Sequence, residues 1–468
     1  MAKLFLNHKN EISSIVEKLK NNQISIFCGA GAVADFTKIN WENLFNEDID
    51  LNNVKIDNFY KLATYYELHM DRATLESKFT NAFNKVPTNE LYSNHIKNIL
   101  ELPITEFWTT NYDEIIETMI KNETGLIPSV IYNSENLIKI KENKKYKIFK
   151  LNGSITDSKS MIITESDYNN YIHNQQLLFE QLKRELILKS FVFIGYSFAD
   201  RLVLDCLTEI TNTFKIAKNV HYRILKKDYK NPEYQKIEEK YFEMLYNIKT
   251  IYVDSYEEID ELLKYIYESY KKKNIFISGS FRKFSPDEED RANSLCKSLV
   301  EMLIDEGYNI YSGDGKRLGS YVISNATKKL SEMDSMYMHN KLKIMPYIDH
   351  TFKHKKANDI ERINYVKKMI KDCSVSIFLY GQSESGSYSQ GVMTEFKISE
   401  NSGLKIVPVA STGFSAEKIQ VTLESENRVP SYLERYSSIL KDKNKDTSTI
   451  VETIKDILKE IQKISITR

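Results

Sequence analysis

A short apolar segment that ends in glycines constrains the fold of this chain most. It reads Gln-Ile-Ser-Ile-Phe-Cys-Gly-Ala-Gly, at residues 23–31. An uninterrupted apolar run such as Ile24 to Cys28 that stops at a glycine turn is typical of a buried parallel strand. Glycine lets the backbone approach a ligand closely, and a following helix would aim its free N–H groups at a phosphate. The segment predicts the strand–turn–helix unit of an α/β nucleotide-binding fold.

A second segment, Trp-Thr-Thr-Asn-Tyr-Asp at residues 108–113, also sits where an apolar strand gives way to a loop. The carboxyl ends of strands in an open α/β sheet form the ligand crevice. There the Asn111 carboxamide can hold a ribose hydroxyl or a water, and the Asp113 carboxylate can orient the cationic nicotinamide end of NAD. The alternative interpretation is a turn or a helix N-cap that precedes the helical run at 114–117.

A third segment, Phe-Ile-Gly-Tyr-Ser-Phe at residues 193–198, repeats this pattern. Gly195 offers a close backbone approach, and Ser197 offers a hydroxyl suited to a ribose or a phosphate. The alternative is an ordinary turn at the end of a strand.

Strand-like runs alternate with helical patterns along the whole chain, which predicts mainly parallel sheets covered on both faces. An amphipathic helix is expected at 11–20, and Leu62, Tyr65, Tyr66 and Leu68 are candidate buried residues of a later helix. The α/β pattern restarts at Asn274, after a lysine run. We therefore expect an α/β fold of two Rossmann-like three-layer domains, at residues 1–272 and 273–468. The expected strands are 24–28, 105–109, 146–151, 191–196, 221–225, 250–253, 274–280, 308–311, 341–345, 375–380 and 405–409.

Composition excludes several classes of protein. Lys+Arg and Asp+Glu each total 65, so the net charge is zero, which argues against a dedicated nucleic-acid binder and permits self-association. The four cysteines are widely spaced, so we expect buried free thiols and no metal site. The N-terminus lacks a secretory signal, and no stretch approaches the ~20 apolar residues of a membrane span. We expect a cytoplasmic protein.

The second half carries polar strand ends of its own. Residues 277–280 and the glycine-bearing loop at 313–320 present backbone donors and hydroxyls for an anionic ligand. Residues 375–381 form a third strand end. Downstream, Glu395 is placed to accept hydrogen bonds from ribose hydroxyls, as a carboxylate does in dinucleotide sites. Its alternative role is an acid in the first turns of a helix.

The order of the motifs in the first half resembles the sirtuin family of NAD-consuming enzymes, over about residues 10–255. Asn111 and Asp113 match the family's Thr-Gln-Asn-x-Asp motif. Gly153 matches the glycine of its His-Gly motif, and Gly195 with Ser197 matches its Gly-Thr-Ser. The resemblance implies catalytic roles for Asn111, Asn152 and Asp113. It implies NAD+ contacts, without any metal, at Gly29, Ala30, Gly31, Thr110, Gly195, Tyr196 and Ser197.

The departures from that family bear on catalysis. The zinc-binding cysteines of sirtuin deacetylases are missing, which disfavours lysine deacetylation. Asn152 stands where the family has its catalytic His, and an amide cannot take up a proton near neutral pH. General-base catalysis is worth about 10²–10⁴-fold. The chain is therefore slow, uses another base, or is an inactivated variant, and Asp35 and Asp113 are the nearest substitutes by motif.

The second half is similar to the SLOG domain, a Rossmann-like sensor of nucleotide-derived ligands. A sirtuin-like half followed by a SLOG half resembles the effectors of the bacterial Thoeris anti-phage system. The resemblance implies NAD+ hydrolysis that is activated by a cyclic ADP-ribose isomer, which a TIR-domain protein produces. It also implies homo-oligomers, namely tetramers that can form filaments. The implied signal-binding residues are Gly279, Ser280, Asp314, Ser320, Pro346, Lys367, Gly381, Gly391 and Glu395.

Two other functions remain as alternatives. A catalytically impaired nucleotide sensor, which acts by assembly, fits the amide at Asn152. A Rossmann dehydrogenase is disfavoured because no Gly-x-Gly-x-x-Gly follows the first strand, since Ala34 stands after Gly29 and Gly31.

Overall fold

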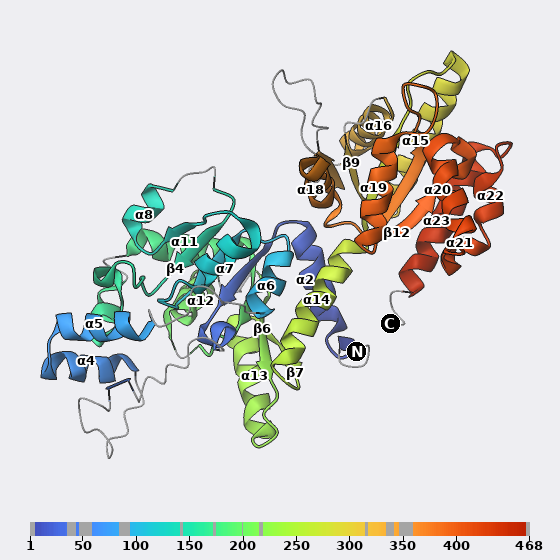
Figure 1. The fold of residues 1–468 in the computed structure, drawn as a ribbon. Helices are drawn as coiled ribbons and strands as arrows, with labels where there is room; N and C mark the ends of the chain where they lie inside the picture. Colours follow the sequence, from blue (N-terminus) through green and yellow to red (C-terminus); the bar gives the residue numbers. More distant parts are fainter. Residues whose placement is uncertain are drawn as a thin grey trace, which may run out of the picture. The chain divides into compact units, whose positions relative to one another are not determined.

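A computed structural model gives the fold of the chain (Figure 1). It divides into two compact units, Leu4–Tyr267 and Glu268–Arg468, and each unit is an α/β structure of its own. The described residues are 5–34, 44–45, 59–83, 94–140, 144–171, 175–198, 200–214, 219–313, 317–333, 341–345 and 359–464.

The first unit is built on a seven-stranded sheet in the order β3-β4-β2-β1-β5-β6-β7. Every pairing between neighbours is parallel, as the alternating sequence pattern predicted. The strand β3 was not predicted, because it has three residues and only Ile131 is buried. The strands are β1 (Ile24–Cys28), β2 (Glu106–Thr109), β3 (Ser129–Ile131), β4 (Lys147–Lys150), β5 (Ser190–Ile194), β6 (His221–Lys226) and β7 (Ile248–Val253).

Helices connect these strands and cover both faces, so that β1 and β5 are buried along their whole length. Phe27, Trp108 and Phe149 pack into one core with α11 and α12. The helices are α2 (Lys9–Lys20), η1 (Ala30–Val33), α4 (Phe59–His69), α5 (Arg72–Phe83), α6 (Asn94–Glu101), α7 (Ile115–Thr124), α8 (Ser134–Ile138), η2 (Ser158–Ser160), α9 (Glu165–Asn169), α11 (Gln176–Leu188), α12 (Leu202–Phe214), α13 (Pro232–Tyr246) and α14 (Glu257–Lys271).

The buried face of α4 differs in part from the prediction. Leu62 and Tyr66 are buried, as expected. The prediction was wrong for Tyr65 and Leu68, which are 42% and 79% exposed. Leu62, Ala63 and Tyr66 define the buried side of the helix, whereas Tyr65 lies at its edge and Leu68 on the opposite side.

The second unit holds a five-stranded parallel sheet in the order β10-β9-β8-β11-β12. The predicted fold class, two mainly parallel Rossmann-like sheets, is therefore confirmed. The strands are β8 (Asn274–Ser280), β9 (Asn309–Gly313), β10 (Leu342–Met345), β11 (Val375–Tyr380) and β12 (Lys405–Pro408). The helices are α15 (Pro286–Asp305), α16 (Leu318–Glu332), α18 (Asp359–Ile370), α19 (Gln390–Asn401), η4 (Ala410–Thr412), α20 (Phe414–Ser425), α21 (Ser431–Glu434), α22 (Ser437–Lys441) and α23 (Thr447–Ile464).

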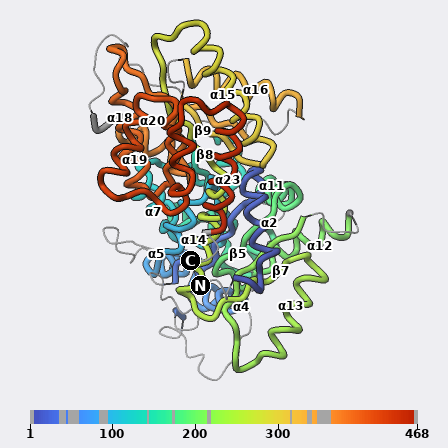
Figure 2. The backbone as a smooth tube through the Cα atoms, turned by 90° about the vertical axis from the view of Figure 1, so that its right-hand side faces the viewer, coloured from blue at the N-terminus to red at the C-terminus, as the bar shows by residue number. Residues whose placement is uncertain are grey.

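The last helix, α23, lies beside α15 (Figures 1 and 2). Its predicted apolar face is buried in the same core as Leu299 of α15. The buried residues of that face are Ile450, Ile454, Leu458 and Ile461. This packing joins the end of the described chain to the first helix of the second unit.

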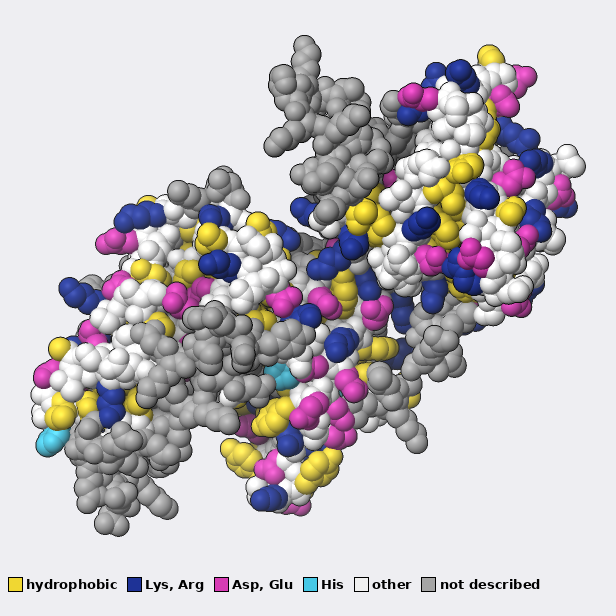
Figure 3. All heavy atoms as spheres, viewed as in Figure 1, with side chains coloured by type: hydrophobic (Ala, Val, Ile, Leu, Met, Phe, Trp, Pro, Cys, Tyr) yellow, Lys and Arg dark blue, Asp and Glu magenta, His cyan; other side chains and the backbone are white. Residues whose placement is uncertain are grey.

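Basic and acidic side chains are interspersed over the visible face of the molecule (Figure 3). All four cysteines are buried and free, as predicted. Within the described ranges, no helix combines the length and the low polarity that crossing a bilayer requires.

Candidate active site

The loops after β1 and β5 meet backbone to backbone. The N–H of Gly29 donates to the carbonyl of Ile194 at 2.9 Å, and the N–H of Gly31 donates to that of Gly195 at 2.8 Å. A Cβ atom at Gly29 would lie 2.3 Å from the carbonyl oxygen of Gly195. These glycines therefore allow two loops to pack together. The N–H groups of Gly29 and Gly31 already donate to protein carbonyl groups. The contact of these glycines with NAD+ stays a prediction.

The loop after β5 is tightly specified. Gly195 has a φ of +63°, and a Cβ there would lie 2.1 Å from the backbone nitrogen of Ala32. The ring of Tyr196 packs on Phe27, with 4.5 Å between ring centroids, and its hydroxyl donates to the Asp200 carbonyl at 2.9 Å. Tyr196 thus contributes to the core, while Ser197 is exposed.

Asn111 connects the β2 loop to the β1 loop. Its side chain is buried, and its Nδ2 donates to the carbonyl oxygen of Gly29 at 3.3 Å. Its backbone N–H donates to Oγ1 of Thr109 at 2.9 Å, which fixes the turn through the half-buried Thr110. The carboxamide predicted to position ribose and water therefore stands beside the glycine turn.

Asp113 takes the turn role that the sequence left open as an alternative. Its buried carboxylate accepts a hydrogen bond from the Ile115 N–H at 3.0 Å, in the first turn of α7. Burial raises the pKa of Asp113, and the positive charge of Lys150 opposes that rise. A role toward the nicotinamide end of NAD+ stays a prediction.

Lys150, the last residue of β4, was missed by the sequence reasoning. Its side chain is fully buried, and Nζ pairs with Glu117 at 2.9 Å. It also donates to the carbonyl oxygens of Tyr112, at 3.1 Å, and Asp113. The available signal was a lysine between the apolar residues Phe149 and Leu151, because a buried amine needs partners. Lys150 holds the turn that carries Asn111.

Asn152, Tyr60 and Asp200 form a hydrogen-bonded cluster. Asn152 follows β4 and is 5% exposed. Its Nδ2 donates to Oδ2 of Asp200 at 2.8 Å, and the Tyr60 hydroxyl donates to the same oxygen at 3.0 Å. Oδ1 of Asn152 is buried and has no hydrogen-bond partner in the part of the chain that the structure describes. The amide therefore has an acceptor left for a ligand.

Asp200 was also missed by the sequence reasoning. Its Oδ1 accepts a hydrogen bond from the Leu202 N–H at 3.1 Å, at the start of α12. Burial is the largest effect on this carboxyl and raises its pKa, while the hydrogen bonds from Leu202, Asn152 and Tyr60 lower it. The sequence signal was weak, since an acid just before a helix usually serves as a cap.

Four of the predicted motifs follow four strands that are adjacent in the order β4-β2-β1-β5. The sheet thus brings together Asn152, Asn111, the Gly29 turn and Gly195. Gly153 has a φ of +87° and lies against Ser160, which shapes the β4 loop. Asp35 lies outside the described residues. The arrangement can surround the ribose of a dinucleotide with buried carboxamides.

The predicted signal-binding residues of the second unit lie at strand ends and helix starts. Gly279 packs against β11, because a Cβ there would lie 2.1 Å from the carbonyl oxygen of Leu379. Ser280 ends β8, and its carbonyl oxygen accepts from the Gly381 N–H at 2.9 Å. Glu395 accepts a hydrogen bond from the buried Ser278 hydroxyl at 2.5 Å.

The remaining predicted signal-binding residues are more dispersed along the chain. Ser320 is an exposed residue in the first turn of α16, and Gly391 is half-buried in the first turn of α19. Lys367 is exposed on α18. Asp314 and Pro346 lie outside the described residues. The structure therefore joins Gly279, Ser280, Gly381 and Glu395 around the ends of β8 and β11.

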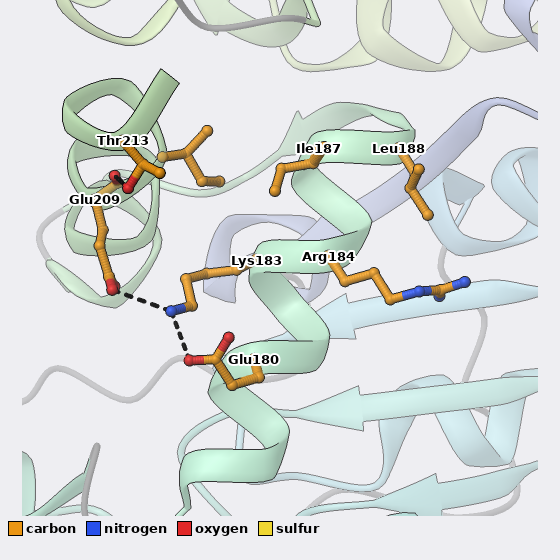
Figure 4. Close-up of a pocket in the computed structure, with 8 residues that line it drawn as sticks. Glu180, Lys183, Arg184, Ile187, Leu188, Glu209 and Thr213 are labelled. Carbon is orange, nitrogen blue, oxygen red and sulfur yellow. Dashed lines mark hydrogen bonds and ion pairs between the residues drawn. The ribbon is translucent and has the colours of Figure 1, made fainter. Parts of the chain in front are cut away.

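Two hollows have linings that do not include these residues. One, of about 450 Å³, lies between α11 and α12, where Lys183 bridges Glu180 and Glu209 (Figure 4). Its lining includes the last turns of both helices, which lie toward the amino ends of parallel strands and away from the four loops. The other, of about 360 Å³, is in the second unit and is lined by aromatic residues that include Phe284, Tyr380 and Phe414.

The fold and the loop cluster define a protein with a sirtuin-like unit followed by a SLOG-type unit. Family models agree with this description. A SIR2-like domain matches residues 105–251, and the Sir2- and TIR-associating SLOG family matches residues 258–461.

Curated relatives extend the match to nearly the whole chain. A protein from Bacillus cereus (strain MSX-D12) named NAD(+) hydrolase ThsA is 28% identical over 97% of this chain and 98% of its own length. A protein of the same name from Acinetobacter baumannii (strain 532279) is 27% identical over 96% of this chain and 98% of its own length. Another, from Enterococcus faecium, is 29% identical over 87% of this chain and 88% of its own length. The chain is therefore similar to these ThsA proteins over nearly its whole length.

Proposed function

We propose that this chain hydrolyses NAD+ to ADP-ribose and nicotinamide. The observation that carries the proposal is the placement of Asn111 and Asn152, two buried carboxamides, after the adjacent strands β2 and β4. The names of the full-length relatives support the same reaction.

The proposed reaction breaks the bond between C1′ of ribose and the nicotinamide nitrogen. The electron pair of that bond leaves with nicotinamide, and an oxocarbenium-like ribose is attacked by water. Asn111 would position the water and the ribose. Oδ1 of Asn152 would accept a hydrogen bond from a ribose hydroxyl, since this acceptor has no partner among the described residues.

We further propose that the second unit regulates this activity. A cyclic ADP-ribose isomer, made by a TIR-domain protein, would bind near Ser280, Gly381 and Glu395. The match to a Sir2- and TIR-associating SLOG family supports this role. The signal can activate hydrolysis only if it binds the active arrangement more tightly than the resting one. The biological outcome would be NAD+ depletion in the cytoplasm during phage infection. The active form would be a homo-oligomer, either a tetramer or a filament.

One observation favours a second candidate, a catalytically impaired sensor that acts by assembly. Asn152 stands at the position of the family's base, and an amide does not accept a proton near neutral pH.

A single assay separates the two candidates. The purified full-length chain is incubated with NAD+, with and without cyclic ADP-ribose isomers, and released nicotinamide is measured by chromatography. Nicotinamide release that increases with one isomer is the expected result. No release with any isomer, combined with release by the Asn152→His variant, would establish the sensor. Release that no isomer changes would retain the hydrolase and remove the regulation.

A further inference from the structure

Hydrolysis of NAD+ sets a chemical requirement that Asn152 does not meet. Water that adds to C1′ must lose a proton, and a carboxamide does not take one up. A carboxylate beside the buried carboxamides can accept this proton. The following inference rests on the proposed NAD+ hydrolysis and identifies this acceptor.

Asp200 is the carboxylate in direct contact with Asn152. Its Oδ2 accepts hydrogen bonds from Asn152 Nδ2 at 2.8 Å and from the Tyr60 hydroxyl at 3.0 Å. Three separate elements thus supply the cluster, namely α4, the loop after β4 and the residue ahead of α12. Asn152 is buried, and Asp200 is half-buried as a whole residue.

A purely structural role explains only half of these contacts. The Oδ1 atom accepts from the Leu202 N–H at 3.1 Å and so caps α12, which a neutral Asn or Ser does equally well. Capping gives no reason for an ionisable group whose second oxygen is shared by Asn152 and Tyr60. Burying a carboxylate costs free energy, and this cost indicates that Asp200 has a function besides the turn.

The surroundings of Asp200 favour proton uptake. No ion pair forms between Asp200 and a cationic side chain of the described residues. Burial raises its pKa, which brings the carboxyl closer to the pH at which a general base works best. Among the described residues, the titratable side chains that interact with it are five tyrosines and one acid, namely Tyr60, Tyr112, Tyr168, Tyr171, Tyr196 and Asp205.

We propose that Asp200 is the catalytic residue that accepts the proton of the attacking water, while Asn152 and Tyr60 hold its carboxylate in place. The C1′–N bond breaks, and its electron pair leaves with neutral nicotinamide. A lone pair of the water oxygen forms the new C1′–O bond. The proton of that water passes to Asp200 and then to solvent, which accounts for the one proton that hydrolysis of NAD+ releases.

The test compares Asp200→Asn with the unmodified full-length chain, at the activator concentration that gives the highest rate. We expect kcat for nicotinamide release to fall about 100-fold or more, in the range of general-base catalysis. The dissociation constant for NAD+ and the midpoint of thermal unfolding are expected to change little. The unmodified chain is expected to lose rate as the pH falls through the pKa of the base, and this acidic limb disappears in Asp200→Asn.

A matched control and a rescue sharpen the test. Asp205→Asn removes a neighbouring acid that binds the Tyr168 hydroxyl at 2.8 Å, and it should keep kcat within about 3-fold since it leaves the proposed base in place. Adding Asn152→His to Asp200→Asn supplies a new titrating group beside the lost one. This double variant should recover at least about 10-fold of kcat, with an acidic limb near the ordinary imidazole pKa of about 6.5.

The outcomes separate this inference from the function on which it rests. A near-normal kcat and an unchanged pH profile in Asp200→Asn would remove Asp200 as the base and leave NAD+ hydrolysis intact. No nicotinamide release by the unmodified chain, under any isomer, would overturn both. If Asp200→Asn does not fold, the same measurements on Asp200→Ser decide, because the serine hydroxyl retains the cap of α12.

Discussion

The backbone N–H of Gly31 donates to the carbonyl oxygen of Gly195 across 2.8 Å, which fastens the loop after β1 to the loop after β5. The two strands are neighbours in the sheet, so both loops leave the same edge. The contact needs glycine on both sides, because side chains would fill the gap. The glycine motif, which in sequence is typical of a phosphate-binding loop, thus also allows the loops after β1 and β5 to pack together.

Gly195→Ala is expected to destabilise the first unit by more than about 3 kcal/mol, because it adds a clash with Ala32 to the ~1–2 kcal/mol cost of a left-handed backbone. Gly125→Ala is the matched control. Gly125 has a φ of +70°, but a Cβ there meets nothing within 4 Å. Chemical denaturation of both variants measures the difference. Equal losses of stability would mean that the loops separate without cost.

Much of the fold could be predicted from sequence because buried parallel strands are apolar along their whole length. The runs at β1, β5 and β11 are fully buried, and each stops at or just before a glycine. The strand β3 has no such run, and its pairing with β4 becomes visible only in the sheet. The exposed Tyr65 shows the converse limit, since aromatic residues do not by themselves identify the buried face of a helix.

Lys150→Met is expected to destabilise the first unit by about 3–5 kcal/mol, because it leaves the carboxylate of Glu117 buried without its partner. Lys139→Met is the control, since the Lys139–Glu135 pair is 74% and 79% exposed and should contribute about 0–1 kcal/mol. Denaturant unfolding gives both values. Adding Glu117→Gln to Lys150→Met should recover part of the loss, and no recovery would contradict the buried pair.

Site residues that belong to a sequence motif could be predicted. Residues whose role depends on a contact with a distant part of the chain could not. Asn111 and Asn152 follow strands in recognisable motifs. Asp200 gains its significance from Tyr60, which is remote in sequence, and from the amide at Asn152. In sequence, Asp200 has only the pattern of an acid at the start of a helix. Only the folded structure shows that its two oxygens have different hydrogen-bond partners.

His221 should make stability depend on pH. Burial lowers its pKa to about 3, and its Nδ1 accepts a hydrogen bond from the Phe191 N–H at 3.1 Å. The unfolded chain has an imidazole pKa of about 6.5, so between these values the unfolded state binds a proton that the folded state does not. The contribution of His221 to the free energy of unfolding is therefore fully present above about pH 6.5. It falls by up to about 1.4 kcal/mol per unit as the pH drops toward 3.

His221→Asn removes this titration while its Oδ1 can still accept from Phe191. Denaturant unfolding between about pH 4.5 and 7 should show a shallower loss of stability than in the unmodified chain. His69→Asn, at an exposed position at the end of α4, is the control and should keep the original slope. An unchanged slope in His221→Asn would mean that the imidazole titrates equally in both states.

The pairing of Glu395 with Ser278 provides a test of the proposed signal site. The carboxylate on α19 accepts from the Ser278 hydroxyl on β8 at 2.5 Å. If Glu395 also accepts from the ribose hydroxyls of the signal, Glu395→Ala should weaken binding of the activating cyclic ADP-ribose isomer by about 10-fold or more, since hydrogen bonds to charged groups are worth ~1.5–3 kcal/mol. Ser278→Ala keeps the carboxylate and removes only the internal bond, so binding should stay within about 3-fold. Calorimetry with the full-length chain gives both affinities. Equal weakening by the two variants would assign Glu395 to holding α19 against β8, and unchanged binding in Glu395→Ala would exclude it from the signal site.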